Sequence, residues 1–322
     1  MKAIVIYFPG NPENLSLEER LIADPSDGEV HVRVRAFGLN RSELMTRKGY
    51  SPNVTFPRIL GIECVGEVVE DPSGEFEGGQ KVAALMGGMG RDYDGSYAEY
   101  AVLPKAILVP FESRLEWSVL GAMPEMFHTV NGSLHLSLNI EKDEILLIRG
   151  GTSSIGLLAL QLAKQTGIRV ISTTRKQEKT ELLTKNGADY VVIDDGKISE
   201  KVRQIFPEGV HKVLELVGTS TLKDSLKSVV TGGTVCMTGM LSEAWAIADF
   251  EPMEYIPSSV HFTVFDSGQH KMDKIAFQKF ISDVEAGKIH INISRVFGLE
   301  EIVEAHRLME SNMAGGKIVI KL

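Results

Sequence analysis

Residues 145–167 place an apolar run, a turn of small residues and a helix-forming segment in immediate succession. Ile145-Leu146-Leu147-Ile148 is the short, continuous apolar run that a buried parallel strand needs. Gly150-Gly151-Thr152-Ser153-Ser154-Ile155-Gly156 follows directly, and the next residues favour a helix that stops at Gly167. The segment therefore predicts a strand, a tight turn and a helix, which is the repeating unit of a parallel α/β sheet.

The small residues of this turn have a possible chemical use besides packing. A pyrophosphate approaches backbone N–H groups and the positive end of a helix only where side chains are absent. Gly151 and Gly156 fit the first and third positions of the G-x-G-x-x-G pattern, but Ser153 stands where the middle glycine belongs. A dinucleotide site and a turn made for packing alone are both compatible with this loop. The candidate phosphate-binding residues are Gly151, Thr152, Ser153, Ser154, Ile155 and Gly156.

The end of the next predicted strand favours the dinucleotide site and indicates which dinucleotide binds. After Arg169-Val170-Ile171-Ser172, where a carboxylate would hold the ribose hydroxyls of NAD, the chain has Thr173, Thr174 and Arg175. Hydroxyls followed by Arg175 and Lys176 can bind a 2′-phosphate, which an Asp at this point would repel. NADPH (NADP) is therefore the expected cofactor; the alternative is that the two cations only begin a solvated helix.

Composition excludes several classes of protein. The net charge of −9 over 322 residues argues against nucleic acid or an anionic membrane as the main partner, because like charges repel. The two cysteines, Cys64 and Cys236, lie far apart without neighbouring metal ligands, so neither a disulfide framework nor a zinc ribbon is expected. The N-terminus has too short an apolar run for a signal peptide, and no segment approaches 18 apolar residues. A cytoplasmic location is the expectation.

The chain changes pattern along its length. Residues 1–120 carry short alternating segments broken by turn residues, which predicts an irregular β domain. From there to about residue 266, strands alternate with helices, and two helical segments and a last strand follow. The predicted strands of this doubly wound domain are Ile145 to Ile148, Arg169 to Thr173, Tyr190 to Ile193, Lys212 to Leu216, Thr234 to Met237 and His261 to Phe265.

Several separated motifs resemble the zinc-independent quinone oxidoreductase group of the medium-chain dehydrogenase/reductase superfamily, over nearly the full length. Besides the glycine loop, they include Ala36 to Glu43, Pro57 to Gly66, Asp94 to Tyr100 and Ala314 to Val319. The resemblance implies a GroES-like β-barrel catalytic domain from residues 1–120 and 267–322, and a Rossmann nucleotide-binding domain from residues 121–266. It also implies an active site in a cleft between the domains.

The resemblance has consequences for a metal and for catalysis. Zinc alcohol dehydrogenases of this superfamily have a Cys where Asn40 stands and a His where Ile62 stands, so no zinc is expected. The oxyanion that forms on hydride transfer then needs hydrogen-bond donors. Asn40 and Tyr50 match the family positions nearest to that task and are the candidate catalytic residues. The alternatives are that Asn40 is a turn residue and Tyr50 a surface aromatic.

Further cofactor contacts are carried over from the family. Thr129 matches a helix residue near the nicotinamide, and Lys317 matches an element that reaches the cofactor. Asp194 is a departure, because a carboxylate that points inward there would oppose a phosphate. The remaining candidates follow predicted strands, where ligands of such sheets sit: Val217, Thr238, Gly239 and Met240.

The resemblance implies NADPH-dependent, metal-independent hydride transfer to a quinone or an α,β-unsaturated carbonyl, with a small-molecule electron acceptor as partner. Chemistry would reside largely in the cofactor, while the protein orients the reactants and excludes water. An enoyl-thioester or alkenal double-bond reductase and a non-catalytic NADPH-binding sensor are the alternatives, because a fold does not determine a function. A homodimer paired through the edge strand His261 to Phe265 is also expected.

Overall fold

The computed structural model describes residues 1–322, and the chain separates into two compact units. The split unit consists of Met1–His128 and Ser267–Leu322, and the inserted unit consists of Thr129–Asp266. The first change of unit falls within the helix α3 (Pro124–Asn131), somewhat later than the position near residue 120 that the sequence predicts.

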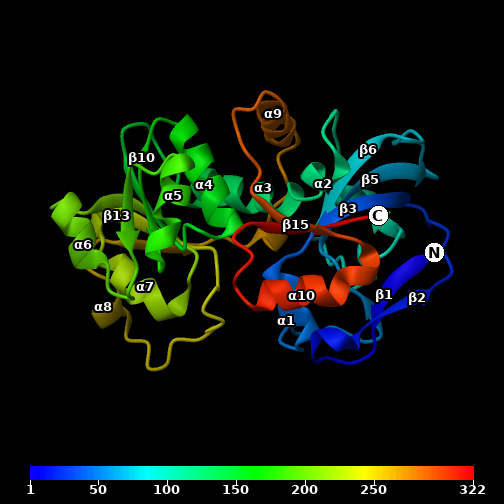
Figure 1. Cartoon of the computed structure of the whole chain (residues 1–322), viewed down its shortest axis with the longest axis horizontal. Coiled ribbons are helices and arrows are strands. Elements are labelled where there is room, and N and C mark those ends of the chain that lie inside the picture. Colours follow the sequence, from blue (N-terminus) through cyan, green and yellow to red (C-terminus); the bar gives the residue numbers. More distant parts are fainter. The chain divides into compact units, whose positions relative to one another are not determined.

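The inserted unit is built on a six-stranded parallel sheet in the order β11-β10-β9-β12-β13-β14 (Figure 1). Its strands confirm the six predicted from the sequence, and β14 lies at one edge as expected. The strands are β9 (Ile145–Arg149), β10 (Arg169–Thr174), β11 (Tyr190–Ile193), β12 (Val210–Glu215), β13 (Val229–Met237) and β14 (His261–Val264). The helical segments are η3 (Gly132–Ser137), α4 (Ser154–Gln165), η4 (Gln177–Lys179), α5 (Thr180–Lys185), α6 (Ser199–Ile205), α7 (Thr219–Leu226) and α8 (Pro252–Tyr255).

Helices cover both faces of this sheet, which is why its strands are apolar without alternation. Ile145 and Leu147 point to the core that α6 and α7 close with residues such as Val202 and Leu222. Leu146 and Ile148, which are also fully buried, point to the opposite face. Figure 1 shows α4 and α5 on one side of the strands and α7 on the other.

The split unit contains two β-sheets. One has three strands in the order β2-β1-β4, and the other follows the order β15-β16-β3-β5-β6-β8, with β7 also paired to β3. The strands are β1 (Lys2–Ile6), β2 (Leu15–Glu19), β3 (Glu29–Gly38), β4 (Arg58–Ile59), β5 (Glu63–Glu70), β6 (Lys81–Leu85), β7 (Tyr100–Pro104), β8 (Leu108–Pro110), β15 (Ile293–Phe297) and β16 (Lys317–Lys321). The helices are η1 (Pro12–Asn14), α1 (Arg41–Arg47), η2 (Lys105–Ile107), α2 (Trp117–Leu120), η5 (Ser267–Gln269), α9 (Lys274–Glu285), η6 (Leu299–Glu301) and α10 (Ile302–Glu310).

The last strand joins the sheet of the N-terminal part of the split unit. β16 runs antiparallel to β3, with Val319 opposite Gly38, and the Leu39 N–H donates to the Ile318 carbonyl at 2.9 Å. This register brings the start of β16 to the end of β3, where α1 begins. No helix of the structure is long and apolar enough to cross a membrane.

Candidate active site and nucleotide site

Ser153, in the glycine loop between β9 and α4, is the N-cap of α4. Ser153 precedes the first helical residue, and its Oγ accepts a hydrogen bond from the Gly156 N–H at 3.0 Å. The same hydroxyl donates to the Gly150 carbonyl at 2.8 Å. Serine is a favoured N-cap because it satisfies an N–H group of the first turn that lacks a helical partner. The departure from the three-glycine pattern therefore has a structural reason.

The first and third glycines of the pattern are required by close packing. A Cβ on Gly151 would overlap Ser172 Oγ, and a Cβ on Gly156 would lie 2.7 Å from the Gly150 carbonyl oxygen. The loop thus packs directly on β10 and on itself. Thr152, Ser154 and Ile155 complete the stretch that begins α4, where N–H groups and the helix dipole favour an anion.

The residues after β9 and β10 are connected by side-chain hydrogen bonds. Thr173 is buried, and its Oγ1 accepts from the Gly150 N–H at 3.1 Å, so this hydroxyl holds the glycine loop. Thr174 is also buried, and its Oγ1 accepts from the Lys176 N–H at 3.2 Å. The next residue, Arg175, is exposed, and its guanidinium makes neither an ion pair nor a hydrogen bond. Of the three predicted 2′-phosphate residues, only Arg175 is therefore exposed with an unbound side chain.

Arg149, to which the sequence analysis gave no role, accounts for the unexpected Asp194. Its guanidinium is fully buried and binds the Asp194 carboxylate in a bidentate manner, at 2.8 and 3.0 Å. It also donates to Asp224 Oδ2 at 2.8 Å. Burial alone would lower the pKa of Arg149, but the hydrogen bonds and charge of Asp194 raise it on balance. Arg149 therefore compensates the Asp194 charge, and this carboxylate is not free to face the glycine loop.

The other predicted cofactor residues of the inserted unit form two neighbouring groups. Thr129 and Thr238 are linked through Ser133, whose Oγ donates to the Thr129 carbonyl at 2.7 Å and lies 2.9 Å from Thr238 Oγ1. At the end of β12, the Val217 N–H donates to Glu215 Oε1 at 2.7 Å. There the close approach of neighbouring backbone leaves no space for a side chain at Gly239, and Met240 Sδ lies 3.2 Å from where a Cβ on Gly218 would be. The structure thus brings these strand-end residues together.

In the split unit, Asn40 precedes α1 and stands within a cluster of charged side chains. The buried members are Glu43, Glu63 and Lys317, and Asn40 itself is half-buried. Asn40 Nδ2 donates to Glu63 Oε1 at 2.8 Å, and Lys317 Nζ donates to Asn40 Oδ1 at 2.6 Å and to Glu63 Oε1 at 2.8 Å. We call these four residues the Asn40 cluster.

Glu43 is the acid of the Asn40 cluster without a cationic partner. Its Oε2 accepts from the Asn40 N–H at 3.1 Å, and its Oε1 accepts from the Ile62 N–H at 3.3 Å. Burial, together with the charge of Glu63, raises the pKa of Glu43 to about 8. Glu43 is therefore mostly protonated at neutral pH, and the remaining charges of Glu63 and Lys317 balance.

Two signals in the sequence point to Glu43 and Glu63, which the family resemblance does not identify. Glu43 lies three residues after Asn40, the spacing of a capping box. Glu63 is an acid among apolar residues at the beginning of a strand, and a buried acid needs hydrogen-bond or ion-pair partners. Neither signal identifies Lys317 as a partner, because that contact depends on the pairing of β16 with β3.

Tyr50 is not part of the Asn40 cluster. Its side chain is 67% exposed and makes no hydrogen bond, and it follows Gly49, which has a φ of +82°. Its role in catalysis stays a prediction. Ile62, at the second position where zinc relatives have a ligand, is buried, and no group of three or more His, Cys, Asp or Glu side chains is arranged to hold a metal ion.

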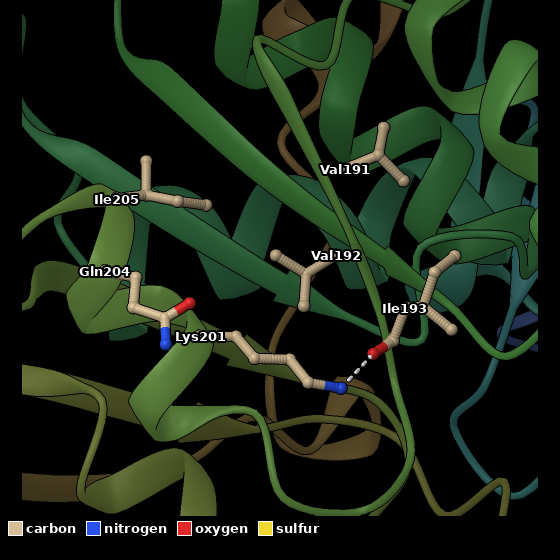
Figure 2. A pocket seen from close by; sticks show the side chains of 6 residues that line it. All are labelled: Val191, Val192, Ile193, Lys201, Gln204 and Ile205. Atoms are coloured by element: carbon tan, nitrogen blue, oxygen red, sulfur yellow. Dashed lines mark hydrogen bonds between the residues drawn. The ribbon is translucent and has the colours of Figure 1, made fainter.

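One cavity, of about 370 Å³, lies at the other edge of the inserted sheet, between β11 and α6 (Figure 2). Its single ammonium, on Lys201, donates to the Ile193 carbonyl at 3.0 Å and to Asp195 at 2.6 Å. No residue predicted to bind cofactor or substrate lines it. The lining residues are Val191, Val192, Ile193, Lys201, Gln204 and Ile205.

Comparisons with known proteins agree with both parts of this architecture. The model of the alcohol dehydrogenase GroES-like domain matches residues 26–113, and that of the zinc-binding dehydrogenase matches residues 154–282. An acryloyl-coenzyme A reductase of Sulfurisphaera tokodaii is 30% identical over 353 residues, covering 100% of both chains. Human quinone oxidoreductase is 25% identical over 330 residues, covering 100% of this chain and 98% of its own.

A solved structure shows the same fold. Escherichia coli quinone oxidoreductase complexed with NADPH superimposes with a TM-score of 0.89 at 22% identity, covering 100% of each chain. This superposition confirms the predicted fold. The chain belongs to the quinone oxidoreductase group of the medium-chain dehydrogenase/reductase superfamily and is an oxidoreductase.

Proposed function

We propose that this protein transfers hydride from NADPH to a quinone or an α,β-unsaturated carbonyl without a metal. The proposal rests on three features of the chain: a capped glycine loop, an exposed Arg175 after β10, and the Asn40 cluster, whose amide and ammonium can donate hydrogen bonds. The names of the relatives support the acceptor class, because a quinone and an acryloyl thioester are both electron-poor and conjugated to a carbonyl.

NADPH is favoured over NADH by charge. The end of β10 has hydroxyl residues and Arg175 instead of an acid, and Arg149 compensates Asp194, the carboxylate that follows the neighbouring strand β11. A 2′-phosphate would pair with the free guanidinium of Arg175, because arginine is suited to phosphate geometry. Thr173 and Thr174 would act mainly by shaping the loop, since both hydroxyls already have backbone partners.

When bound, the nicotinamide supplies the hydride, and the protein has to stabilise the negative charge that develops on the acceptor oxygen. Asn40 would do so by donating a hydrogen bond. The ammonium of Lys317 lies 2.6 Å from Asn40 Oδ1, so a zinc ion brought to that oxygen would meet a positive charge at hydrogen-bond distance. This repulsion supports a metal-independent reaction.

The test is nicotinamide oxidation, followed by absorbance, with NADPH and NADH against a panel of quinones, enones and acryloyl thioesters. We expect NADPH-dependent turnover that shifts toward NADH in Arg175→Ala but not in Lys185→Ala, a control cation that is already paired with Glu181 at 2.7 Å. Turnover confined to acryloyl thioesters or alkenals would favour a double-bond reductase. Tight NADPH binding without turnover on any acceptor would contradict the enzymatic proposal and favour a nucleotide-binding sensor.

A homodimer paired through β14 is part of the proposal. β14 pairs only with β13, and Val264 at its end is 54% exposed, so the outer side of the strand has unpaired backbone groups. Light scattering of the purified protein measures the oligomeric state. The Phe265 N–H donates to Met237 of β13, so the Val264 N–H, one residue earlier in the strand, faces outward. Substitution of Val264 by proline would remove this outward-facing donor and is expected to increase the monomer fraction.

A further inference from the structure

The Asn40 carboxamide is held at both of its ends. On one side Nδ2 donates to Glu63 Oε1 at 2.8 Å, and on the other Oδ1 accepts from Lys317 Nζ at 2.6 Å. An ammonium can only donate and a carboxylate can only accept, so the two partners determine which way the amide points. If the amide were rotated by 180°, Nδ2 would face Lys317 and Oδ1 would face Glu63, and both hydrogen bonds would be lost.

The two partners are themselves fixed. Glu63 begins β5, is fully buried, and its second oxygen accepts from the Glu125 N–H at 2.8 Å. Lys317 begins β16 and is 3% exposed. Its stem passes over Gly38, where any Cβ would overlap Lys317 Cε. Three elements that are distant in sequence therefore converge on one carboxamide.

This arrangement leaves one hydrogen of Asn40 weakly engaged. The first Nδ2 hydrogen makes the 2.8 Å bond to Glu63, while the remaining contacts of Nδ2, to the Gly38 carbonyl and to Glu43 Oε1, are both 3.4 Å long. A substrate oxygen can replace contacts of this length at little cost. The charge-assisted bond from Lys317 to Oδ1 polarises the amide and makes its N–H groups better donors.

We propose that Lys317 and Glu63 are positioning residues that orient and polarise the Asn40 carboxamide, so that its second N–H is directed at the oxygen of the acceptor. The inference rests on the proposed function and assigns Lys317 a role through Asn40 in place of the expected contact with the cofactor. The acceptor class it implies has a carbonyl or quinone oxygen that gains negative charge during hydride transfer.

A double-mutant cycle tests the coupling. Lys317→Met is expected to lower kcat by roughly tenfold or more with the KM and Kd for NADPH within about threefold, because only transition-state stabilisation is lost. In the Asn40→Ala background, Lys317→Met should change kcat by less than about twofold, since a residue that acts through Asn40 has nothing left to act on. Lys317→Arg, which keeps a donor cation, should recover part of the lost kcat.

Additional variants separate positioning from folding. Lys317→Met leaves the Glu63 charge buried without its cation, so Lys317→Met/Glu63→Gln, which removes both charges, is measured beside it. Thermal unfolding and NADPH affinity report whether each variant is folded. If Lys317→Met does not fold, the cycle is run with the charge-free double variant against Asn40→Ala in the same way.

Each outcome decides between roles. Equal losses of kcat in both backgrounds would overturn the inference and leave the proposed function intact. A tenfold weaker NADPH affinity in Lys317→Met, with kcat unchanged, would also overturn it and return Lys317 to the cofactor. Absence of turnover in the wild-type protein with every acceptor would overturn both the proposed function and this inference.

Discussion

Each unit has a buried cation that binds carboxylates, Arg149 in the inserted unit and Lys317 in the split unit, but the two networks differ in how their carboxylates are paired. In the inserted unit, Arg149 pairs directly with Asp194 and Asp224, and the acids also accept backbone N–H groups, such as those of Gly196 and Ile198. In the split unit, Lys317 pairs with Glu63 alone, and Glu43 has no cation within ion-pair distance. In the first network both aspartates contact the cation, whereas in the second Glu43 contacts none, and the charges of the second balance only when Glu43 carries a proton.

The difference shows that the geometry of each cation suits a different role, structural for Arg149 and catalytic support for Lys317. A guanidinium has five donors in a rigid fork, and Arg149 uses it to tie together the ends of β9, β11 and α7. An ammonium is a compact charge on a flexible stem, and Lys317 directs it at a single carboxamide. We therefore expect the loss of Arg149 to lower the free energy of unfolding. The loss of residues of the Asn40 cluster should instead change the pH dependence of stability and the turnover rate.

The largest effect on stability is expected from Arg149→Met. It leaves the Asp194 and Asp224 carboxylates without their cation and should destabilise the inserted unit by about 3–5 kcal/mol. Hydrogen exchange of peptides from β9, β11 and α7 measures the loss within that unit, and Lys185→Met, an exposed cation of α5 paired only with Glu181, is the control. A loss below about 1 kcal/mol would show that the acids are satisfied by backbone donors alone.

Glu43→Gln should change the pH dependence of stability. Between its ordinary pKa of 4.5 in the unfolded chain and about 8 in the folded protein, Glu43 holds a proton that the unfolded chain has released. Its contribution to stability is therefore complete below 4.5 and is lost as the pH rises through 8, with a slope of at most about 1.4 kcal/mol per pH unit. Urea unfolding from pH 5 to 9 should show a flatter profile for the variant.

Burial also raises the pKa of Glu215, so the wild-type profile contains both acids. The difference between wild type and Glu43→Gln isolates Glu43, and Glu70→Gln, an exposed change at the end of β5, serves as the control. Parallel profiles for wild type and Glu43→Gln would mean that Glu43 is ionised throughout, and the contrast between the two networks would disappear.

Asp194→Asn should have an intermediate effect. The variant weakens one arm of the bidentate pair, but Arg149 keeps Asp224, so we expect a loss of about 1–3 kcal/mol. The ratio of kcat/KM for NADPH to that for NADH should stay within about threefold of wild type, because Arg149 already compensates the carboxylate. A tenfold gain in preference for NADPH would show that the 2′-phosphate does experience the Asp194 charge.

Thr173→Val should have the smallest effect. It keeps the shape of the side chain but removes the acceptor of the Gly150 N–H, which costs about 1 kcal/mol and should weaken NADPH binding by about fivefold. Isothermal titration measures the affinity, and Thr184→Val, on exposed α5, is the comparison. Unchanged binding would mean that the glycine loop does not depend on β10 for its conformation.

Local patterns were sufficient to predict much of the fold. The apolar run Ile145–Ile148, the small-residue turn and the helix that follows are determined by neighbouring residues, and the structure has all three. The six strands followed from the same alternation, and the edge position of β14 was implied by the family resemblance. Short-range preferences repeat in each unit of such a sheet, which is why they are readable along the chain.

Contacts between distant segments were not predictable in this way. The sequence leaves open whether Asp194 points inward and opposes a phosphate, because its partner, Arg149, is 45 residues away and lies on a strand separated from β11 by β10. The sequence likewise does not reveal that the Lys317 ammonium reaches a residue 277 positions earlier in the chain. Both depend on which strands are neighbours and on their register, and neither is written in the local sequence.

The pairing of β16 with β3 has a consequence for biosynthesis. Asn40 is made early, but Lys317 lies beyond the whole inserted unit, so a nascent chain holds Asn40 without the cation that orients it. The inserted unit is contiguous and can fold during translation, whereas the Asn40 cluster can form only after β16 has been synthesised. Competence to bind nucleotide would therefore precede competence to turn over substrate during synthesis.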